Sequence, residues 1–148
     1  MRAVIQRVSQ AKVTVNERTV GTIGRGLLVF LGISRTDSVE DAAYLLDKVL
    51  WLRIFNDENG KMNLDVNQVS GSAMVISQFT LYGDASKGNR PNFTDAAKPE
   101  IAKKLYERFI LELQALLGEN RVAEGIFGAM MKVELINDGP VTIWLDSC

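Results

Sequence analysis

A short polar segment at the end of an apolar run holds the side chains best suited to chemistry, Ser77-Gln78-Phe79-Thr80-Leu81. The hydroxyls of Ser77 and Thr80 become nucleophiles when a neighbouring base accepts their proton. Gln78 adds an amide, and a turn at Phe79 and Thr80 would direct two backbone N–H groups towards one point, as in an oxyanion hole. The same hydroxyls also bind backbone groups at ordinary strand ends. The segment therefore predicts either an acyl-transfer site or a hydrogen-bonded strand end.

The sequence contains no histidine, which restricts this chemistry. Ser-His-Asp and Cys-His arrangements are excluded, and so are the usual ligand sets of zinc hydrolases. Cys148 is the only cysteine, so the chain can form neither an internal disulfide nor a cysteine-based zinc site. We expect no metal and no cofactor. The remaining nucleophile candidates are Ser77, Thr80 and Cys148. No base for Ser77 or Thr80 is evident, so a side-chain nucleophile is weakly supported, and backbone N–H groups are the alternative.

A second segment, Asn137-Asp138-Gly139-Pro140-Val141-Thr142, separates two apolar stretches, Val133–Ile136 and Val141–Leu145. Asp-Gly is typical of the centre of a tight hairpin. Pro140 follows at once and cannot donate to a strand ladder. We expect two strands joined by a connection other than a tight hairpin, and the pattern leaves the isomer of the Gly139-Pro140 bond open.

The remaining patterns predict the elements that position these segments. β-type stretches lie at Val4–Val8, Lys12–Val15, Val20–Ile23, Leu27–Ile33, Arg53–Phe55 and Ser72–Ser77. The stretch at Leu27–Ile33 is apolar throughout, which indicates a strand buried on both faces. We interpret Gly21, Gly24 and Gly26 as turn glycines and Tyr82–Asn92 as an exposed loop.

Two helices are expected. Asp37 or Ser38 caps the first, with Glu40 or Asp41 as reciprocal partner. Its buried face would comprise Val39, Ala42, Leu46, Val49 and Leu50. The second begins near Pro99 and ends at Gly118. Its buried stripe would comprise Ile101, Leu105, Phe109, Leu113, Leu116 and Leu117. Together these elements predict an α+β (mixed α/β) fold of mostly antiparallel sheets with partly barrel-like curvature and two main helices, in a single domain, 1–148.

The composition narrows the classes of partner that the protein is expected to bind. The 17 basic and 18 acidic residues give a net charge of -1, which argues against broad nucleic-acid binding but not against a local contact with an RNA end. The candidates for that contact are Lys87, Arg90, Lys103 and Lys104. We expect no DNA partner. The longest apolar run, Leu27–Leu31, is too short to span a membrane, and the first residues do not resemble a signal peptide, so a cytoplasmic location is expected.

With these two segments, the chain resembles the D-aminoacyl-tRNA deacylases of the bacterial and eukaryotic type along its whole length. Further matching stretches are Met1–Val8, Arg53-Ile54-Phe55, Gly60-Lys61-Met62-Asn63, Arg90-Pro91-x-Phe93 and Phe127-Gly128-Ala129. Ser77-Gln78-Phe79 also separates it from related deacylases that remove L-alanine, which carry Pro-Gln and a small residue there. Members of the family often have an acid after Phe-Gly-Ala, where this chain has Met130.

The resemblance implies a homodimeric esterase that cleaves D-amino acids, and glycine, from the 3′ end of tRNA, with active sites at the subunit interface. Gly139-Pro140 would be cis, enter the partner's pocket and exclude L-side chains. Ser77, Gln78, Phe79 and Thr80 would hold the ester, and the 2′-hydroxyl of the terminal adenosine would assist cleavage. Arg7 and Asn137 would support the Gly-Pro segment.

The resemblance also implies that Phe127 and Met131 line the substrate site, although both are equally compatible with an ordinary core. Two other interpretations stay open at this point. One is a non-catalytic module of the same fold that binds the aminoacyl-tRNA end, and the other is a small oligomeric domain whose Gly-Pro step serves packing.

Overall fold

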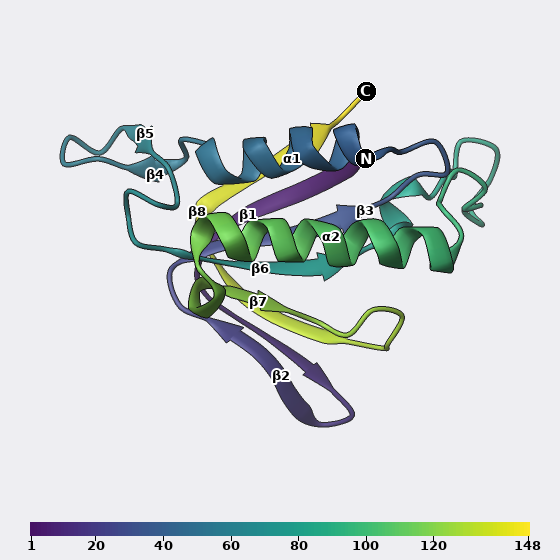
Figure 1. Cartoon of the computed structure of the whole chain (residues 1–148), viewed down its shortest axis with the longest axis horizontal. Coiled ribbons are helices and arrows are strands. Elements are labelled where there is room, and N and C mark those ends of the chain that lie inside the picture. The colour runs from purple at the N-terminus through teal and green to yellow at the C-terminus, as the bar shows by residue number, and fades with distance from the viewer.

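The computed structural model describes the whole chain, Met1–Cys148, as a curved six-stranded sheet with two long helices against one of its faces and a separate two-stranded sheet, β4-β5 (Figure 1). The sheet order is β2-β1-β3-β6-β7, and β8 pairs with the other edge of β1. The strands are β1 Arg2–Val15, β2 Arg18–Ile23, β3 Gly26–Gly32, β4 Phe55–Asn56, β5 Met62–Leu64, β6 Ser72–Ser77, β7 Val122–Glu124 and β8 Lys132–Asp146. The helices are α1 Val39–Trp51 and α2 Pro99–Leu117, with 3-10 turns η1 Phe79–Tyr82 and η2 Glu119–Arg121. The predicted mixed α/β, barrel-like fold is confirmed.

Strand β1 is paired on both edges. Its first half pairs with β3 and its second half with β2, both antiparallel, while β8 runs antiparallel along the opposite edge. The sheet curls until β2 approaches β7, where a Cβ on Gly21 would lie 2.9 Å from Glu124 O. Gly21 therefore lies in a strand at the closing seam, and the turn predicted there is wrong. Gly26 also lies in a strand, β3, where a Cβ would overlap the backbone of Ser72, so that only Gly24 occupies a turn.

Strands β3, β6 and β7 are parallel, so their carboxyl ends lie at the same edge of the sheet. Leu27–Leu31 is buried on both faces apart from the half-buried Phe30, as predicted. A large apolar core lies between the sheet and the helices, and a smaller one lies inside the curl on the opposite face. The carboxyl edge of these strands is thus held by packing from both sides.

Helix α1 begins at Ser38 as predicted. The Ser38 hydroxyl accepts a hydrogen bond from the Asp41 N–H, and the Asp41 carboxylate accepts one from the Ser38 N–H. The predicted face is buried except for Val39, which is 37% exposed because it lies in the first turn, beyond the sheet. This capping box fixes the point at which the helix begins.

Helix α2 begins at Pro99 and is capped by Gly118, as predicted. Its packed stripe contains Leu105, Phe109, Leu113 and Leu117. Ile101 and Leu116 are 49% and 61% exposed, so the prediction that both are buried is wrong. Tyr106 and Ile110 fill the face instead, since the sheet below the helix determines which side is covered.

The second polar segment lies inside one strand, not between two. Both halves of β8 pair with β1: Asn137 stands opposite Val8, and Thr142 stands opposite Gln6. Residues 138–141 therefore bulge out opposite Arg7 alone. The expectation of two separate strands is wrong because a shared partner keeps the two halves in line, whereas the expectation that no tight hairpin forms is confirmed.

Candidate active site

The first segment lies at the carboxyl edge of the parallel strands. Ser77 is the last residue of β6 and pairs with Leu31, and the Gln78 N–H donates to Leu31 O at 2.8 Å. A Cβ on Gly32 would lie 2.9 Å from Gln78 O, so the chain leaves β6 in close contact with β3. The strand thus ends where the sequence predicts, and the polar residues follow at the sheet edge, where ligands bind in many α/β proteins.

The turn η1 presents the N–H groups of Phe79 and Thr80. Its first internal hydrogen bond runs from the Leu81 N–H to Gln78 O at 3.3 Å, and no side chain caps its start. The leading N–H groups of a helical turn have no acceptor within the turn. Phe79 is 55% exposed, and Thr80 is exposed beside it. These two donors are placed to bind the oxygen of a carbonyl ligand.

The Thr80 hydroxyl is hydrogen-bonded to a neighbour that is not a base. It accepts a hydrogen bond from Nε2 of Gln78, two residues earlier. No lysine amine or carboxylate forms a hydrogen bond with it. This arrangement lacks the base that an activated hydroxyl nucleophile needs.

Phe127 and Met131 lie near the same edge. β7 runs parallel beside β6, and the chain after β7 passes the end of β6, where a Cβ on Gly125 would lie 3.2 Å from Ile76 Cδ1 and would meet Met131 Sδ. Phe127 packs on Tyr106 with ring centroids 5.7 Å apart. Both Phe127 and Met131 are half-buried, so each also presents surface to solvent. Met130 is 92% exposed between them.

Two ionisable groups under this edge are shifted towards their neutral forms. Burial raises the pKa of the Tyr106 hydroxyl, which donates to Val75 O at 2.9 Å. Burial, with a smaller contribution from Glu107, raises the pKa of Glu124. Neither group forms a hydrogen bond with Ser77, Gln78 or Thr80. Both lie in the packing beneath the carboxyl edge of the parallel strands.

The second segment is an exposed bulge closed by a side chain. The Gly139-Pro140 peptide bond is cis. Asn137 spans the bulge, because its Oδ1 accepts from the Val141 N–H at 2.8 Å and its Nδ2 donates to Val141 O at 3.2 Å. The side chain takes the place of the missing ladder bonds and holds Asp138, Gly139 and Pro140 outward.

Arg7 lies under this bulge and is only 8% exposed. Its Nε donates to Asp138 O at 2.7 Å, and its Nη1 donates to Ile54 O at 2.7 Å and to Asn56 Oδ1 at 3.3 Å. A buried guanidinium is tolerated when such acceptors satisfy it. Arg7 therefore ties the bulge to the segment that follows α1.

The two segments are far apart within one chain. In the strand register, Ser77 of β6 is level with Leu31 of β3, Ala3 of β1 and Leu145 of β8. The bulge lies opposite Arg7 of β1. The β3 residue that pairs with Arg7 is level with Ala73 of β6, four residues before Ser77. Two strands separate β6 from β8. Three strand spacings across the sheet and four residues along it amount to roughly 19 Å at ~4.8 Å and ~3.3 Å each. Within one chain the two segments are therefore not neighbours.

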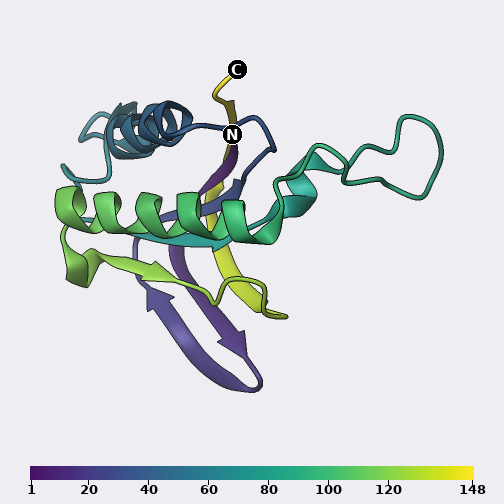
Figure 2. The same ribbon diagram turned by 45° about the vertical axis from the view of Figure 1, so that its right-hand side comes forward.

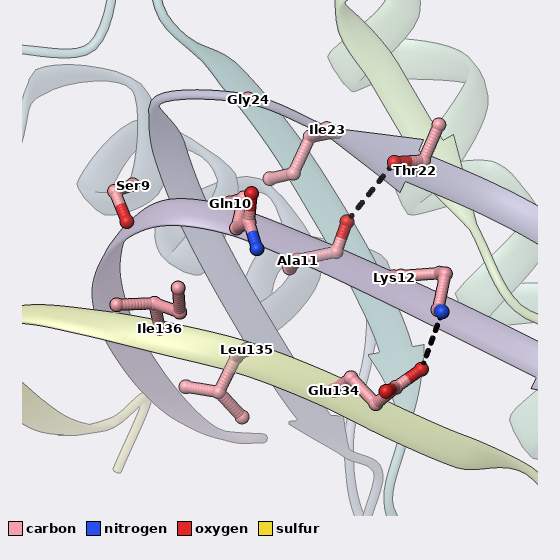
Figure 3. Close-up of a pocket in the computed structure, with 10 residues that line it drawn as sticks. All are labelled: Ser9, Gln10, Ala11, Lys12, Thr22, Ile23, Gly24, Glu134, Leu135 and Ile136. Carbon is pink, nitrogen blue, oxygen red and sulfur yellow. Dashed lines mark hydrogen bonds and ion pairs between the residues drawn. The ribbon is translucent and has the colours of Figure 1, made fainter.

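One cavity lies elsewhere and contains none of the predicted site residues. It has a volume of about 620 Å³ and opens where β1 leaves β3 for β2. Figure 3 shows Ser9 and Gln10 at one end and the ion pair between Lys12 Nζ and Glu134 Oε2, 2.7 Å apart, at the other. It is a hollow of the curved sheet in which Lys12 is already paired with Glu134.

Part of the sheet face opposite the helices is uncovered. Val4, Phe30 and Trp144 are cross-strand neighbours there, and Trp144 is 53% exposed. Next to them, Oε1 of Gln6 is buried without a hydrogen-bond partner. A buried acceptor without a donor is rare in native proteins. This face could not be predicted from the sequence, because the alternation along β1 shows only that one side is apolar and not what covers it.

The basic residues proposed for RNA contact fall in two places. Lys87 and Arg90 lie in the loop between η1 and α2, and Lys103 and Lys104 are exposed on α2. Lys103 is paired with Glu107 at 3.7 Å. No helix is long and apolar enough to cross a membrane.

The chain is similar to known proteins over nearly its whole length. The family model described as D-Tyr-tRNA(Tyr) deacylase matches residues 4–146. The D-aminoacyl-tRNA deacylase of Thermotoga petrophila is 58% identical over 99% of this chain and 97% of that protein. A solved structure described as c-Myc DNA Unwinding Element Binding Protein superimposes with a TM-score of 0.94 at 41% identity, over 99% of this chain and 98% of that one. A probable eukaryotic D-amino acid tRNA deacylase superimposes with a TM-score of 0.83 at 20% identity over 98% of both chains, which is a likeness of fold.

Proposed function

This chain belongs to the D-Tyr-tRNA(Tyr) deacylase family and is a D-aminoacyl-tRNA deacylase, a hydrolase, and from this premise we propose how it works. It releases D-amino acids from the 3′ end of tRNA in the cytoplasm and thereby removes mischarged tRNA from translation. The active site is shared by two copies of the chain. Its partner is the end of a tRNA and not DNA, and a net charge of -1 agrees with a local contact and not with broad nucleic-acid binding.

The ester is held by main-chain groups. The N–H groups of Phe79 and Thr80 bind the ester carbonyl oxygen and stabilise the charge that develops on it. A water molecule adds to the carbonyl carbon, the ester C–O bond breaks, and a proton passes to the ribose oxygen. The 2′-hydroxyl of the terminal adenosine assists the attack. No histidine is needed, which agrees with a sequence that has none.

Selection of the D-amino acid is assigned to Gly139-Pro140 of the partner chain. The observation that carries this proposal is the separation of roughly 19 Å between the two segments, estimated from the strand register. A second copy can bring its own bulge to the cradle formed by Ser77–Thr80. The rigid carbonyl groups of that bulge then lie beside Cα of the substrate, where an L-side chain collides and a D-side chain does not. Glycine carries no side chain and is also accepted.

The uncovered sheet face provides the surface for this second copy. Trp144 and Phe30 supply apolar area, and Gln6 Oε1 lacks a donor. The face is continuous along β8 with the bulge at Gly139. Homodimers bury the same patch on both copies, so Gln6 would meet a donor from its counterpart.

Release of tyrosine from tRNA tests the function. Incubation of the purified protein with D-Tyr-tRNA should release tyrosine, whereas L-Tyr-tRNA should stay charged at the rate of spontaneous hydrolysis. The readout is the amount of amino acid freed over time. Equal release from both substrates would contradict chiral selection. Binding of D-Tyr-tRNA without any release would favour the non-catalytic module.

Thr80→Ala should retain substantial activity, within about threefold of the unaltered protein, because alanine keeps the backbone N–H that binds the carbonyl oxygen. The measurement is kcat for D-Tyr-tRNA, with the melting temperature as a check of folding. Thr80→Ser is the matched control, since it keeps the hydroxyl. A folded Thr80→Ala variant without activity beside an active Thr80→Ser would instead make Thr80 the nucleophile.

A further inference from the structure

We propose that the loop Asp84–Asn92, called the arm below, binds the phosphates of the RNA strand that leads to the aminoacylated adenosine. This role rests on the deacylase mechanism proposed above. It adds a second contact to the substrate, outside the cradle formed by Ser77–Thr80 and the bulge at Gly139-Pro140.

The arm starts directly at the ester cradle. The Gly83 N–H donates to Thr80 O at 2.9 Å, and the arm follows at the next residue. Its two ends are joined by a pair of backbone hydrogen bonds, from the Asp84 N–H to Asn92 O and from the Asn92 N–H to Asp84 O, both 2.9 Å. Figure 2 shows the loop projecting away from the sheet and both helices. The arm is thus a projecting loop, closed at its base, that begins next to the proposed ester-binding segment.

Aromatic packing fixes the base of the arm to the cradle. The rings of Phe79 and Phe93 meet edge to face, with centroids 5.0 Å apart. A Cβ on Gly83 would lie 3.0 Å from the Phe93 ring, so the glycine allows this close packing. Phe79 and Phe93 are still 55% and 37% exposed, which leaves ring surface for a nucleobase. The residue that offers its N–H to the ester is therefore also the residue that positions the arm.

The charge of the arm fits a phosphate backbone. Lys87 and Arg90 are the only charged residues between its two ends, and neither forms an ion pair. The nearby cation Arg35 is neutralised by Asp95 at 3.2 Å. At the base, Asp84 accepts a hydrogen bond from the Ser86 N–H, which lowers the pKa of its carboxyl. Negative charge is thus held at the base, and two free positive charges remain in the projecting part.

RNA is the partner that this geometry fits. The nucleotides before the terminal adenosine must leave the cradle across an exposed surface, and the arm begins four residues after Thr80 with aromatic rings at its base. Aromatic rings with adjacent basic side chains are the usual surface for single-stranded RNA. A chain with a net charge of -1 overall can contact RNA through such a local site.

The test compares Lys87→Ala/Arg90→Ala with Arg18→Ala/Lys61→Ala. The control pair removes the same charges from exposed positions on β2 and beside β5, and neither control residue is in an ion pair. Dissociation constants for uncharged tRNA are measured by fluorescence anisotropy at several salt concentrations. KM is measured for D-Tyr-tRNA and for D-tyrosyl-adenosine, which lacks the preceding nucleotides. Melting temperatures confirm that all variants are folded.

We expect the arm variant to raise Kd for uncharged tRNA and KM for D-Tyr-tRNA about tenfold near physiological salt, because each phosphate contact releases counterions. The slope of log Kd against log salt should fall by about 1.4, at ~0.7 for each contact to a single strand. KM for D-tyrosyl-adenosine should not change. The control variant should match the unaltered protein throughout.

Two results would overturn the arm proposal. One is an unchanged Kd for uncharged tRNA, and the other is an equal rise of KM for D-tyrosyl-adenosine, which would mean that the loop only supports the cradle. Failure of the deacylase mechanism has a separate signature. In that case the unaltered protein releases no tyrosine from D-Tyr-tRNA, while the arm variant still weakens binding of uncharged tRNA.

Discussion

Gly139→Ala is expected to lower kcat/KM for D-Tyr-tRNA about a hundredfold, a loss of ~2.7 kcal/mol of transition-state stabilisation. Gly139 has φ +152°, a region that is nearly restricted to glycine. A Cβ there would lie 2.7 Å from Val141 N and 3.2 Å from Arg7 Nη2. The bulge must shift to accept it, and the carbonyl groups that we propose it presents to the partner's site would move with it.

The assay measures initial rates on D-Tyr-tRNA and L-Tyr-tRNA, together with the melting temperature. Gly60→Ala is the matched control, because Gly60 also has positive φ, at +74°, but lies in open space between β4 and β5. It should keep full activity. A Gly139→Ala variant that is less stable but keeps its rate and its preference for D-tyrosine would show that the Gly-Pro step serves packing alone.

Mixing two inactive variants should restore activity if the site is shared between chains. Phe79→Pro removes one N–H from the cradle, and loss of one such donor costs about 10²–10³ in kcat. Proline suits the first position of a helical turn, so η1 can still form. Phe79→Ala is the control, since it removes the ring and keeps the N–H. It should be much more active than Phe79→Pro.

Phe79→Pro chains are then refolded together with Gly139→Ala chains. About half of the resulting dimers contain one chain of each kind, and each of these dimers has one site with an intact cradle and an intact bulge. The mixture should therefore recover about a quarter of the unaltered activity, well above either variant alone. No recovery from a mixture shown to contain mixed dimers would place both segments of one chain in the same site and contradict the proposed arrangement.

Local signals in the sequence predicted the elements well. The capping pair of Ser38 and Asp41 and the limits of α2 at Pro99 and Gly118 depend only on neighbouring residues, and all are found as expected. The end of β6 at Ser77 is of the same kind. These features are encoded within one turn of helix or one strand, so a single sequence is sufficient to find them.

Features that depend on distant partners could not be predicted in this way. The two halves of β8 form one strand because both pair with β1, more than a hundred residues earlier in the chain. The strand positions of Gly21 and Gly26 follow from close approach to Glu124 and Ser72. Which side of α2 is covered, and hence the exposure of Leu116, also depends on the sheet beneath it.

For the candidate site, too, the local features could be predicted from the sequence and the long-range ones could not. Residue types alone singled out Ser77–Thr80 and Gly139-Pro140. The distance between them within one chain depends on the register of four strands and has no signal in the sequence. The Arg7 contacts with Ile54 and Asn56 likewise join segments that are far apart in the chain. The strand register is therefore the observation from which we propose that the site needs a second copy.

The free N–H groups at the start of η1 have a consequence for mutational scanning and for sequence drift. They belong to the main chain, so any residue except proline at positions 79 and 80 still supplies them. An alanine scan would pass over these donors, and a proline scan would reveal them. A centre of this kind can accept changes in its side chains over evolutionary time, provided that the strand end and the turn keep their shape.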